Sequence, residues 1–260
     1  MSAQEMIGED DPSYVGALAR GLAVIRAFDR GHEALTLAEV AKATVLPRAT
    51  VRRSLLTLQA LGYVASDGKQ FRLTPRILAL GYAYLASTPL PRVLQPALER
   101  VSELTRESCS ASTLDGPEIV YVARAATRRI MSVGLAVGSR LPAFATAMGR
   151  VLLAALPVPA ARTLIEAAPR PRLTPHTVTG LAELERALAV VAQQGYALVD
   201  QELEIGLCAI AVPIRNSAGA VVAAMNVSAQ ATRMGAPELV AEVLPHLREA
   251  AESVRSSLVA

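Results

Sequence analysis

Basic and hydroxyl side chains cluster between Pro47 and Leu61, where their types and spacing favour contact with DNA. At 100° per residue, Val51, Leu55 and Leu58 fall on one apolar stripe of a helix, and the arginines fall on the opposite side. Arginine and threonine contact phosphates and base edges when a helix enters the major groove. The contacts predicted from this helix are those of Arg48, Thr50, Arg52, Arg53 and Thr57.

Two helices and a tight corner must position these side chains. Thr36 and Glu39 have the spacing of a capping box, which predicts that a first helix begins at Thr36. Pro47 suits the first turn of a new helix, so the second helix is predicted to begin near Pro47 or Arg48. Gly62 is typical of the residue that follows a helix end. This order of elements predicts a helix-turn-helix.

A β-hairpin is predicted directly after the second helix. Residues 63–66 and 70–73 form two short strand-like runs, and they flank the turn sequence Asp67-Gly68. A hairpin in this position is a wing. Its Lys69 and Arg72 are placed to touch the phosphate backbone or the minor groove.

An upstream helix is predicted to close a three-helix core. Its apolar residues are Leu18, Leu22, Val24, Ile25 and Phe28. Arg20 on this helix and Thr36 complete the predicted DNA contacts.

The charge distribution agrees with a DNA-binding N-terminal part. Residues 13–80 hold ten Lys/Arg against four Asp/Glu, whereas residues 81–260 hold sixteen against fifteen. Concentrated positive charge favours binding to the phosphates of nucleic acid. The first twelve residues hold four acidic side chains and no basic one.

Composition excludes several other classes of protein. No run is long and apolar enough to span a bilayer and no secretory h-region is present, so a cytoplasmic protein is expected. Cys109 and Cys208 are the only cysteines and are expected to be buried thiols. His32, His176 and His246 are isolated in sequence, so no metal site is expected.

The chain is predicted to contain two domains joined by a helix. Residues 1–12 are expected to be a disordered acidic leader, and residues 13–75 the winged helix-turn-helix domain. Residues 76–91 form the linker helix, and residues 92–260 the second domain. The second domain opens with a helix from 92 to 107, whose apolar residues fit a dimer surface and simple core packing equally well.

Strands at both ends of the second domain, with helices between them, favour an antiparallel sheet covered by helices, an α+β fold. The predicted strands are 110–114, 119–125, 130–136, 196–201, 207–215 and 221–228. The predicted helices are 147–156, 160–168, 181–194 and 237–258.

Four blocks of the sequence have the sequence pattern of one protein family. The blocks are RGLAVIRAF at 20–28, LAEVAKAT with RATVRRSLLTLQALGYV at 37–64, GSRLPAFATAMGRVLLA at 138–154, and QGYALVDQELEIGLCAIAVPIRNSAGAVVAAMNVSA at 194–229. They resemble the IclR family of bacterial transcriptional regulators over nearly the whole chain. RLPAFATAMGRVLLA, DQELEIGL and AMNVSA are most similar to the subgroup that controls the β-ketoadipate pathway.

One residue departs from the family pattern. The family has glycine at the corner between the two helices, where this chain has Val45. Because β-branched residues disfavour positive φ, the corner is expected to be strained or built differently.

The resemblance implies a GAF/PAS-like second domain with an effector pocket between the sheet and the loop entering its first helix. The implied pocket residues are Arg124, Ile130, Ala147, Met148, Asp200, Cys208 or Ala209, Asn226 and Ser228. Backbone N–H groups opening the Ala147 helix would form an anion nest, and Arg124 would supply a counter-charge. Asn226 and Ser228 would hydrogen-bond the ligand, and Asp200 and Glu202 would accept protons from phenol or catechol hydroxyls.

The implied function is a transcriptional regulator whose binding to double-stranded promoter DNA responds to a small aromatic or dicarboxylic acid. Homodimers, alone or paired into tetramers, would bind a palindromic site. Two alternatives stay open: a regulator of another carboxylate pathway, such as acetate or glyoxylate, and an architectural DNA-binding protein without a ligand. No P-loop, dinucleotide fingerprint, HExxH or GxSxG occurs, so no catalytic residues and no cofactor are expected.

Overall fold

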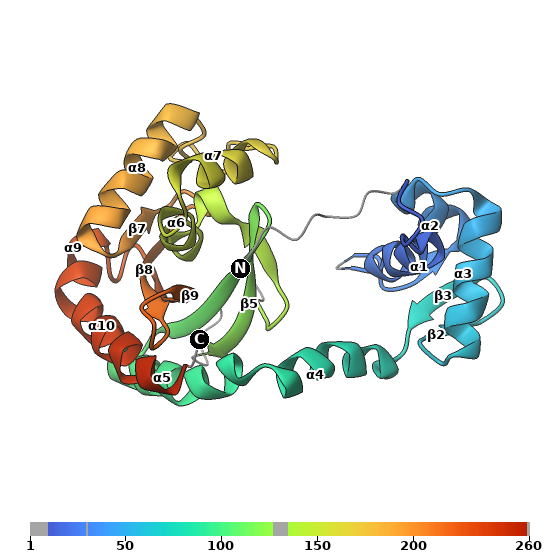
Figure 1. Ribbon diagram of the computed structural model, residues 1–260, viewed down its shortest axis with the longest axis horizontal. Coiled ribbons are helices and arrows are strands. Elements are labelled where there is room, and N and C mark those ends of the chain that lie inside the picture. The colour runs from blue at the N-terminus through green and yellow to red at the C-terminus, as the bar shows by residue number, and fades with distance from the viewer. Residues whose placement is uncertain (1–9, 30, 127–134, 259–260) are drawn as a thin grey trace. The chain divides into compact units, whose positions relative to one another are not determined.

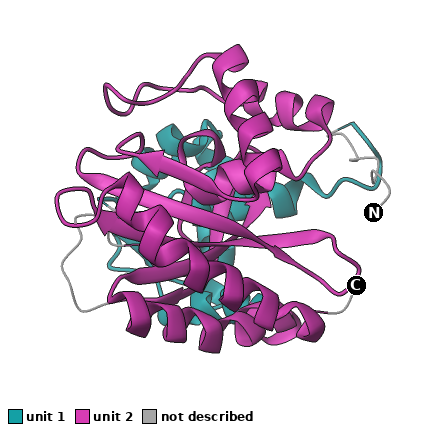
Figure 2. Ribbon diagram, turned by 90° about the vertical axis from the view of Figure 1, so that its left-hand side faces the viewer, with its two compact units in different colours: residues 1–84 teal, residues 85–260 magenta. Residues whose placement is uncertain are grey.

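The computed structural model describes residues 10–29, 31–126 and 135–258, and it divides into two compact units (Figures 1 and 2). The N-terminal unit comprises residues 1–84 and the C-terminal unit residues 85–260. Most of the predicted acidic leader and most of the strand predicted at 130–136 lie outside the described residues. None of the described helices combines the length and the apolar character needed to cross a membrane.

The N-terminal unit is a helix-turn-helix with a wing. Its elements are α1 (Gly16–Arg26), β1 (Leu35–Thr36), α2 (Leu37–Thr44), α3 (Arg48–Ala60), β2 (Val64–Ser66) and β3 (Gln70–Leu73). The strands form an antiparallel sheet in the order β1-β3-β2. Its fully buried core joins all three helices through Val24, Val40, Val51 and Leu55.

The prediction for α1 needs correction. Val24 is buried as expected, but Leu18 and Leu22 are exposed and Phe28 lies beyond the helix end. An apolar stripe fixes which residues share a face but not how much of that face the neighbouring helices cover.

The predicted capping box and the strained corner are both present. Thr36 Oγ1 accepts from Glu39 N at 3.3 Å, and Glu39 Oε2 accepts from Thr36 N at 2.7 Å. The hydrogen bonds that the Glu39 carboxylate accepts from Thr36 lower the pKa of Glu39, with the Thr36 backbone N–H as the largest cause and its hydroxyl as the next. Val45 closes α2 in the left-handed conformation at φ 55° and is 90% exposed. A β-branched residue therefore occupies the position that favours glycine.

A helical connection follows the wing. It comprises η1 (Pro75–Ile77) and α4 (Leu78–Ser87), and none of the α4 side chains is buried. Helix α4 ends before Thr88, which is the N-cap of α5 (Pro89–Thr105). The sequence pattern predicted that this helix would begin near Arg92, but it already includes Pro89 and Pro91. Both prolines fit the first turn of α5, where no N–H is needed. Helix α5 packs on the sheet through Leu94, Leu98 and Val101, whereas Leu104 is exposed.

The C-terminal unit is one six-stranded antiparallel sheet in the order β6-β5-β4-β9-β8-β7, with helices on both faces (Figure 2). The strands are β4 (Ser108–Asp115), β5 (Glu118–Ala125), β6 (Arg140–Pro142), β7 (Ala197–Asp200), β8 (Leu207–Arg215) and β9 (Val221–Gln230). The short β6 was not predicted. The α+β fold is confirmed.

Each face of this sheet has its own apolar core. One core includes η2 (Ala143–Ala145), α6 (Ala147–Ala154), α7 (Val158–Glu166) and α8 (Leu181–Gln194). The other includes α5, the π-helical segment η3 (Leu239–Val243) and α10 (Leu244–Ser253), preceded by α9 (Ala236–Glu238) and followed by η4 (Arg255–Ser257). The single C-terminal helix predicted from the sequence is therefore interrupted. This arrangement places α6 over the middle of the sheet.

Candidate functional site

Helix α3 presents an arginine-rich face to solvent. Arg48, Arg52 and Arg53 are exposed, and no carboxylate among the described residues pairs with them. Thr50 is half-buried, and the Thr57 hydroxyl donates to the backbone oxygen of Arg53 at 2.9 Å. Because Val51, Leu55 and Leu58 hold the opposite stripe in the core, the basic side chains must face outward.

The wing turn is held by the Asp67 carboxylate. Asp67 Oδ1 accepts from the backbone N–H groups of Lys69 at 2.9 Å and of Gln70 at 2.8 Å. These bonds lower the pKa of Asp67, with Gln70 the largest cause. Arg72 lies 3.6 Å from Asp67 Oδ2, whereas the exposed Lys69 makes no ion pair within the described chain.

The other two predicted contacts have different surroundings. Arg20 is exposed on α1 rather than on α3. The Thr36 hydroxyl accepts from Glu39 N and donates to Glu39 Oε2 at 2.8 Å, so it is occupied by the capping box. The exposed basic side chains among the predicted contacts therefore lie mainly on α3 and the wing.

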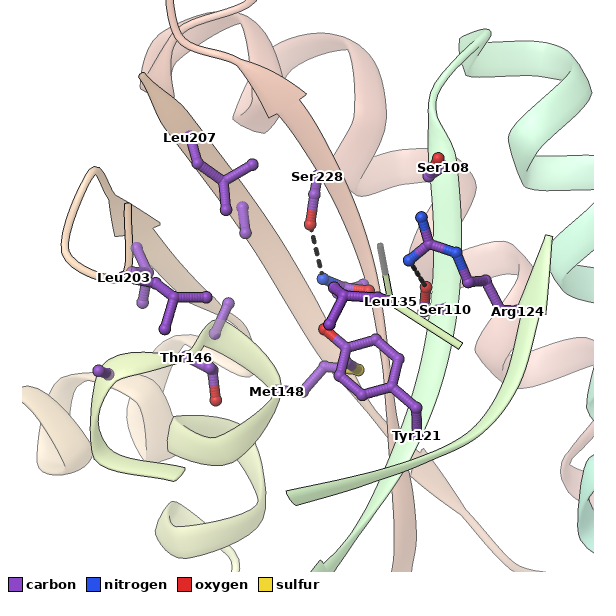
Figure 3. A pocket seen from close by; sticks show the side chains of 15 residues that line it. Ser108, Ser110, Tyr121, Arg124, Leu135, Thr146, Met148, Leu203, Leu207 and Ser228 are labelled. Carbon is purple, nitrogen blue, oxygen red and sulfur yellow. Dashed lines mark hydrogen bonds between the residues drawn. The ribbon is translucent and has the colours of Figure 1, made fainter. Parts of the chain in front are cut away.

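A cavity of about 660 Å³, its open mouth included, lies between the sheet of the C-terminal unit and the entry to α6 (Figure 3). Its apolar wall consists of Leu135, Ala145, Ala147, Met148, Val199, Leu203, Leu207 and Ala209. Its polar lining consists of Ser108, Ser110, Tyr121, Arg124, Thr146, Asn226 and Ser228. An apolar cavity with a few convergent polar groups is the usual form of a small-molecule site.

Strand register brings the polar lining together. Ser110 is paired with Arg124 on one neighbouring strand and with Asn226 on the other. Ser108 is paired with Ser228 in the same way. Since residues two apart share a face of a strand, these five side chains point to the same side of the sheet.

Arg124 is the only formally charged residue among the described residues that line the cavity. Its Nη1 donates to Ser110 Oγ at 3.5 Å, and Figure 3 shows the guanidinium beside that serine. A guanidinium stays charged and offers a planar fork that fits a carboxylate. Arg124 therefore favours an anionic ligand.

Asn226 carries a buried acceptor without a partner. Its side chain is 5% exposed, and its Nδ2 donates to Ser228 Oγ at 2.9 Å. Its Oδ1 has no hydrogen-bond partner in the described protein. An unpaired buried acceptor is costly, so a ligand that donates a hydrogen bond here would be stabilised.

Tyr121 adds a neutral hydroxyl to the lining. Burial raises its pKa to about 12, against a smaller lowering by the charge of Arg124. The phenol therefore stays protonated near neutral pH. Figure 3 shows its ring lying across the cavity beside Met148.

Five of the implied pocket residues line this cavity: Arg124, Ala147, Met148, Asn226 and Ser228. Cys208 does not, because it packs in the core on the opposite face of the sheet, and the alternative residue, Ala209, lines the cavity instead. Asp200 also lies outside the lining and accepts a hydrogen bond from Cys208 Sγ at 2.7 Å. Ile130 lies outside the described residues.

The N-terminus of α6 is capped by the side chain of Thr146. Thr146 Oγ1 accepts from Gly149 N at 3.1 Å, which uses one of the N–H groups expected to form the anion nest. The Met148 sulfur accepts from the buried Ser112 hydroxyl at 3.3 Å, so Met148 is also a packing residue. The nest remains a prediction.

Sequence reasoning missed Ser108, Ser110 and Tyr121. The alternation of serines in SCSAS, residues 108–112, was a usable signal because a strand would place them on one face. No local pattern identified Tyr121.

Comparison with known proteins links both sites to one family. Residues 17–68 match the IclR helix-turn-helix domain, and residues 82–256 match the family described as bacterial transcriptional regulator IclR C-terminal. The Pca regulon regulatory protein of Pseudomonas putida is 45% identical over 94% of this chain and 84% of its own length.

Two further relatives have names that mention an aromatic acid. The p-hydroxybenzoate hydroxylase transcriptional activator of Acinetobacter baylyi is 38% identical over 98% of this chain and 95% of its own. An IclR homologue from Microbacterium hydrocarbonoxydans, solved in complex with 4-hydroxybenzoate, is 30% identical with a TM-score of 0.78, covering 93% of this chain and 98% of its own. The chain therefore belongs to the IclR family of bacterial transcriptional regulators.

Proposed function

We propose that this regulator controls genes of aromatic-acid breakdown and that a small hydroxylated aromatic carboxylate in the cavity changes its affinity for promoter DNA. The observation that carries the proposal is that Arg124 and Asn226 line one cavity and that the buried Oδ1 of Asn226 has no partner in the described protein. A guanidinium fits a carboxylate, and a buried acceptor fits a hydroxyl donor.

The rest of the cavity lining favours a ligand with an aromatic ring between its carboxylate and its hydroxyl. The lining is largely aliphatic, with Met148 and Leu203 among its larger members. Such a wall favours a benzene ring over a two-carbon acid. The relatives named for p-hydroxybenzoate or solved with 4-hydroxybenzoate support the same chemical class.

The DNA-binding part of the proposal assigns the operator contacts to α3 and the wing. The contacts assigned are Arg48, Thr50, Arg52, Arg53, Thr57, Lys69 and Arg72, with Arg20 and Thr36 at the margin. Residues 13–75 would bind DNA, residues 76–91 would link, and residues 92–260 would sense the effector. The exposed and unpaired arginines of α3 support this assignment.

The linker supports assembly into a homodimer. Helix α4 has ten residues, none charged and none buried, and it exposes Leu78, Tyr82 and Tyr84. A short isolated helix is marginal in water, and exposed apolar residues favour a protein partner. A second copy of the chain would give the twofold symmetry that a palindromic site requires. Pairing of dimers into tetramers is the larger assembly to test.

The decisive test compares acids that differ by one hydroxyl. Calorimetric titration of the purified protein should give a dissociation constant for 4-hydroxybenzoate about tenfold lower than for benzoate, because only the former can donate to Asn226. Protocatechuate and β-ketoadipate complete the panel. Asn226→Leu should abolish the difference between the two benzoates.

A matched control separates recognition from stability. Asn216 is also buried, but its Oδ1 accepts from Ala220 N at 2.9 Å in a turn outside the cavity. Asn216→Leu should lower stability without changing the ratio of the two affinities. If wild-type protein binds no aromatic acid, or binds benzoate as tightly as 4-hydroxybenzoate, the proposed effector class is wrong.

Promoter binding provides the second readout. Fluorescence anisotropy with labelled DNA from beside the gene should show operator affinity changing when the effector is added. Because the two equilibria are linked, operator DNA must change effector affinity by the same factor. A C-terminal unit packed without a cavity would have favoured a ligand-free architectural protein, whereas an apolar cavity with several polar groups favours a sensor.

A further inference from the structure

A buried ion pair lies just outside the cavity. Arg150 on α6 and Glu202, in the loop after β7, are 5% and 7% exposed, and Arg150 Nη2 lies 2.6 Å from Glu202 Oε2. Neither residue belongs to the cavity lining. Two buried charges are costly unless further hydrogen bonds complete them, so the partners of this pair indicate what it holds in place.

The arginine end reaches one wall of the cavity. Arg150 Nε donates to the backbone oxygen of Phe144 at 3.0 Å. Phe144 directly precedes Ala145 and Thr146, which line the cavity. The guanidinium therefore binds the backbone of that wall and the carboxylate of Glu202 at the same time, which a planar fork with several donors allows.

The glutamate end holds a neighbouring part of the lining, since Leu203 and Thr146 lie on the same side of the cavity (Figure 3). Glu202 is followed by Leu203, which lines the cavity. Glu202 Oε2 also accepts from Val178 N at 2.9 Å, and the backbone oxygen of Glu202 accepts from Thr177 Oγ1 at 2.6 Å. The same loop begins at Gln201, which has a left-handed φ of 57°. Side-chain hydrogen bonds thus add to the backbone bond from Gln201 N to Leu207 O in holding this loop.

We infer that Arg150 and Glu202 are positioning residues that fix Leu203 relative to the Ala145–Thr146 part of the lining and thereby set which ring sizes the cavity accepts. This inference rests on the proposed function, since it concerns binding in the same cavity. Arg150 holds the Ala145–Thr146 wall, Glu202 holds Leu203, and their contact joins the two. Loss of the contact would let Leu203 shift relative to Ala145 and Thr146, which would change the width of the cavity.

The first test variant keeps the charge and removes the fork. In Arg150→Lys a single ammonium replaces the donors that reach both Phe144 and Glu202. The dissociation constant for 4-hydroxybenzoate should rise about tenfold. The preference for 4-hydroxybenzoate over the bulkier 3-methoxy-4-hydroxybenzoate should shrink, whereas a purely stabilising role would not alter that ratio.

The second variant removes both charges, so that no unpaired buried charge can prevent folding. Arg150→Met combined with Glu202→Met removes both charges and keeps the volume apolar, an exchange that proteins often tolerate. It should fold and bind operator DNA as the wild type does, and it should show the same loss of ring-size preference. Arg140→Lys is the matched control, because Arg140 is held by Asp115 and Glu118, each at 2.7 Å, away from the cavity.

The outcomes separate this inference from the proposed function. If the wild type binds none of the acids, the proposed function fails. If the wild type binds and either folded variant keeps both its affinity and its size preference, the positioning role is rejected. If both variants fail to fold, the pair is a folding element and the positioning role is likewise rejected.

Discussion

Arginine is used in contrasting ways in the two units. On α3, Arg48, Arg52 and Arg53 extend into solvent, whereas Arg124 is half-buried in a cavity beside Ser110. Exposed cations attract phosphate over a distance and are screened by salt. A cation in a partly desolvated cavity acts by contact and is screened less. The same guanidinium group therefore lies in a setting that favours long-range attraction in one unit and in a setting that favours contact with a single ligand in the other.

The largest effect is expected from Gly149→Ala in the C-terminal unit. A Cβ atom at Gly149 would lie 2.2 Å from the backbone oxygen of Ala143, so α6 and the cavity wall would have to separate. The free energy of unfolding of the C-terminal unit should fall by about 3 kcal/mol, and effector binding should be lost. Chemical denaturation followed by circular dichroism would measure this.

A helical glycine in the other unit provides the control. Gly21 in α1 has open space where a Cβ would lie, so Gly21→Ala should be neutral or stabilising. Equal destabilisation by the two substitutions would contradict the close approach of α6 to Ala143.

Arg124→Met tests whether the half-buried arginine of the cavity binds the effector. Removing the charge and its hydrogen bonds should raise the dissociation constant for 4-hydroxybenzoate about 100-fold, while operator binding by the effector-free protein stays unchanged. Calorimetry and anisotropy would measure the two affinities. Arg215→Met, at the exposed end of β8, should change neither, and an unaltered effector affinity in Arg124→Met would remove Arg124 from the site.

Arg52→Ala tests whether the exposed arginines of α3 bind DNA. Operator affinity should fall about tenfold, and the slope of log affinity against log salt should become shallower by about one if the contact is to phosphate. Effector affinity in the absence of DNA should not change. Arg186→Ala, on the exposed face of α8, is the matched control, and an equal effect of both substitutions would mean that α3 is not the recognition helix.

The smallest effect is expected at the strained corner. Val45→Gly should stabilise the N-terminal unit by about 1 kcal/mol, because glycine adopts the left-handed conformation without the Cβ clash. Arg106→Gly, at φ 56° in the C-terminal unit, should give less because arginine is not β-branched. Amide hydrogen exchange would measure the stability of each unit separately. If Val45→Gly instead raised operator affinity strongly, the strain would be holding α3 away from its productive position.

Sequence patterns predicted the N-terminal unit better than the cavity, for a physical reason. The capping box at Thr36, the helix from Arg48 and the hairpin at Asp67 depend on residues a few positions apart. The cavity depends on the pairing of β4 with β9, which joins residues more than a hundred positions apart in the chain. Periodicity does not determine such a register, and a shift by one residue exchanges the two faces of a strand.

The errors follow from the same limit. Cys208 and Ala209 are neighbours on β8, and choosing between them required knowing which face of the strand met α6. Leu18, Leu22 and Leu104 have helical spacing for burial, yet the neighbouring elements do not cover them. The Arg150–Glu202 contact joins two segments that carry no shared local pattern.

The central position of β9 in the sheet also has a consequence for synthesis. Asn226 and Ser228 lie near the end of the chain, whereas the helix-turn-helix is complete by Leu73. Because domains fold as units from the N-terminus as the chain is made, the DNA-binding unit can fold while the strand that completes the cavity is still absent. A chain that terminates before β9 would retain α3 and lack a complete cavity. Premature termination before Val221 would thus leave residues 1–84 complete and remove the strand that carries Asn226 and Ser228.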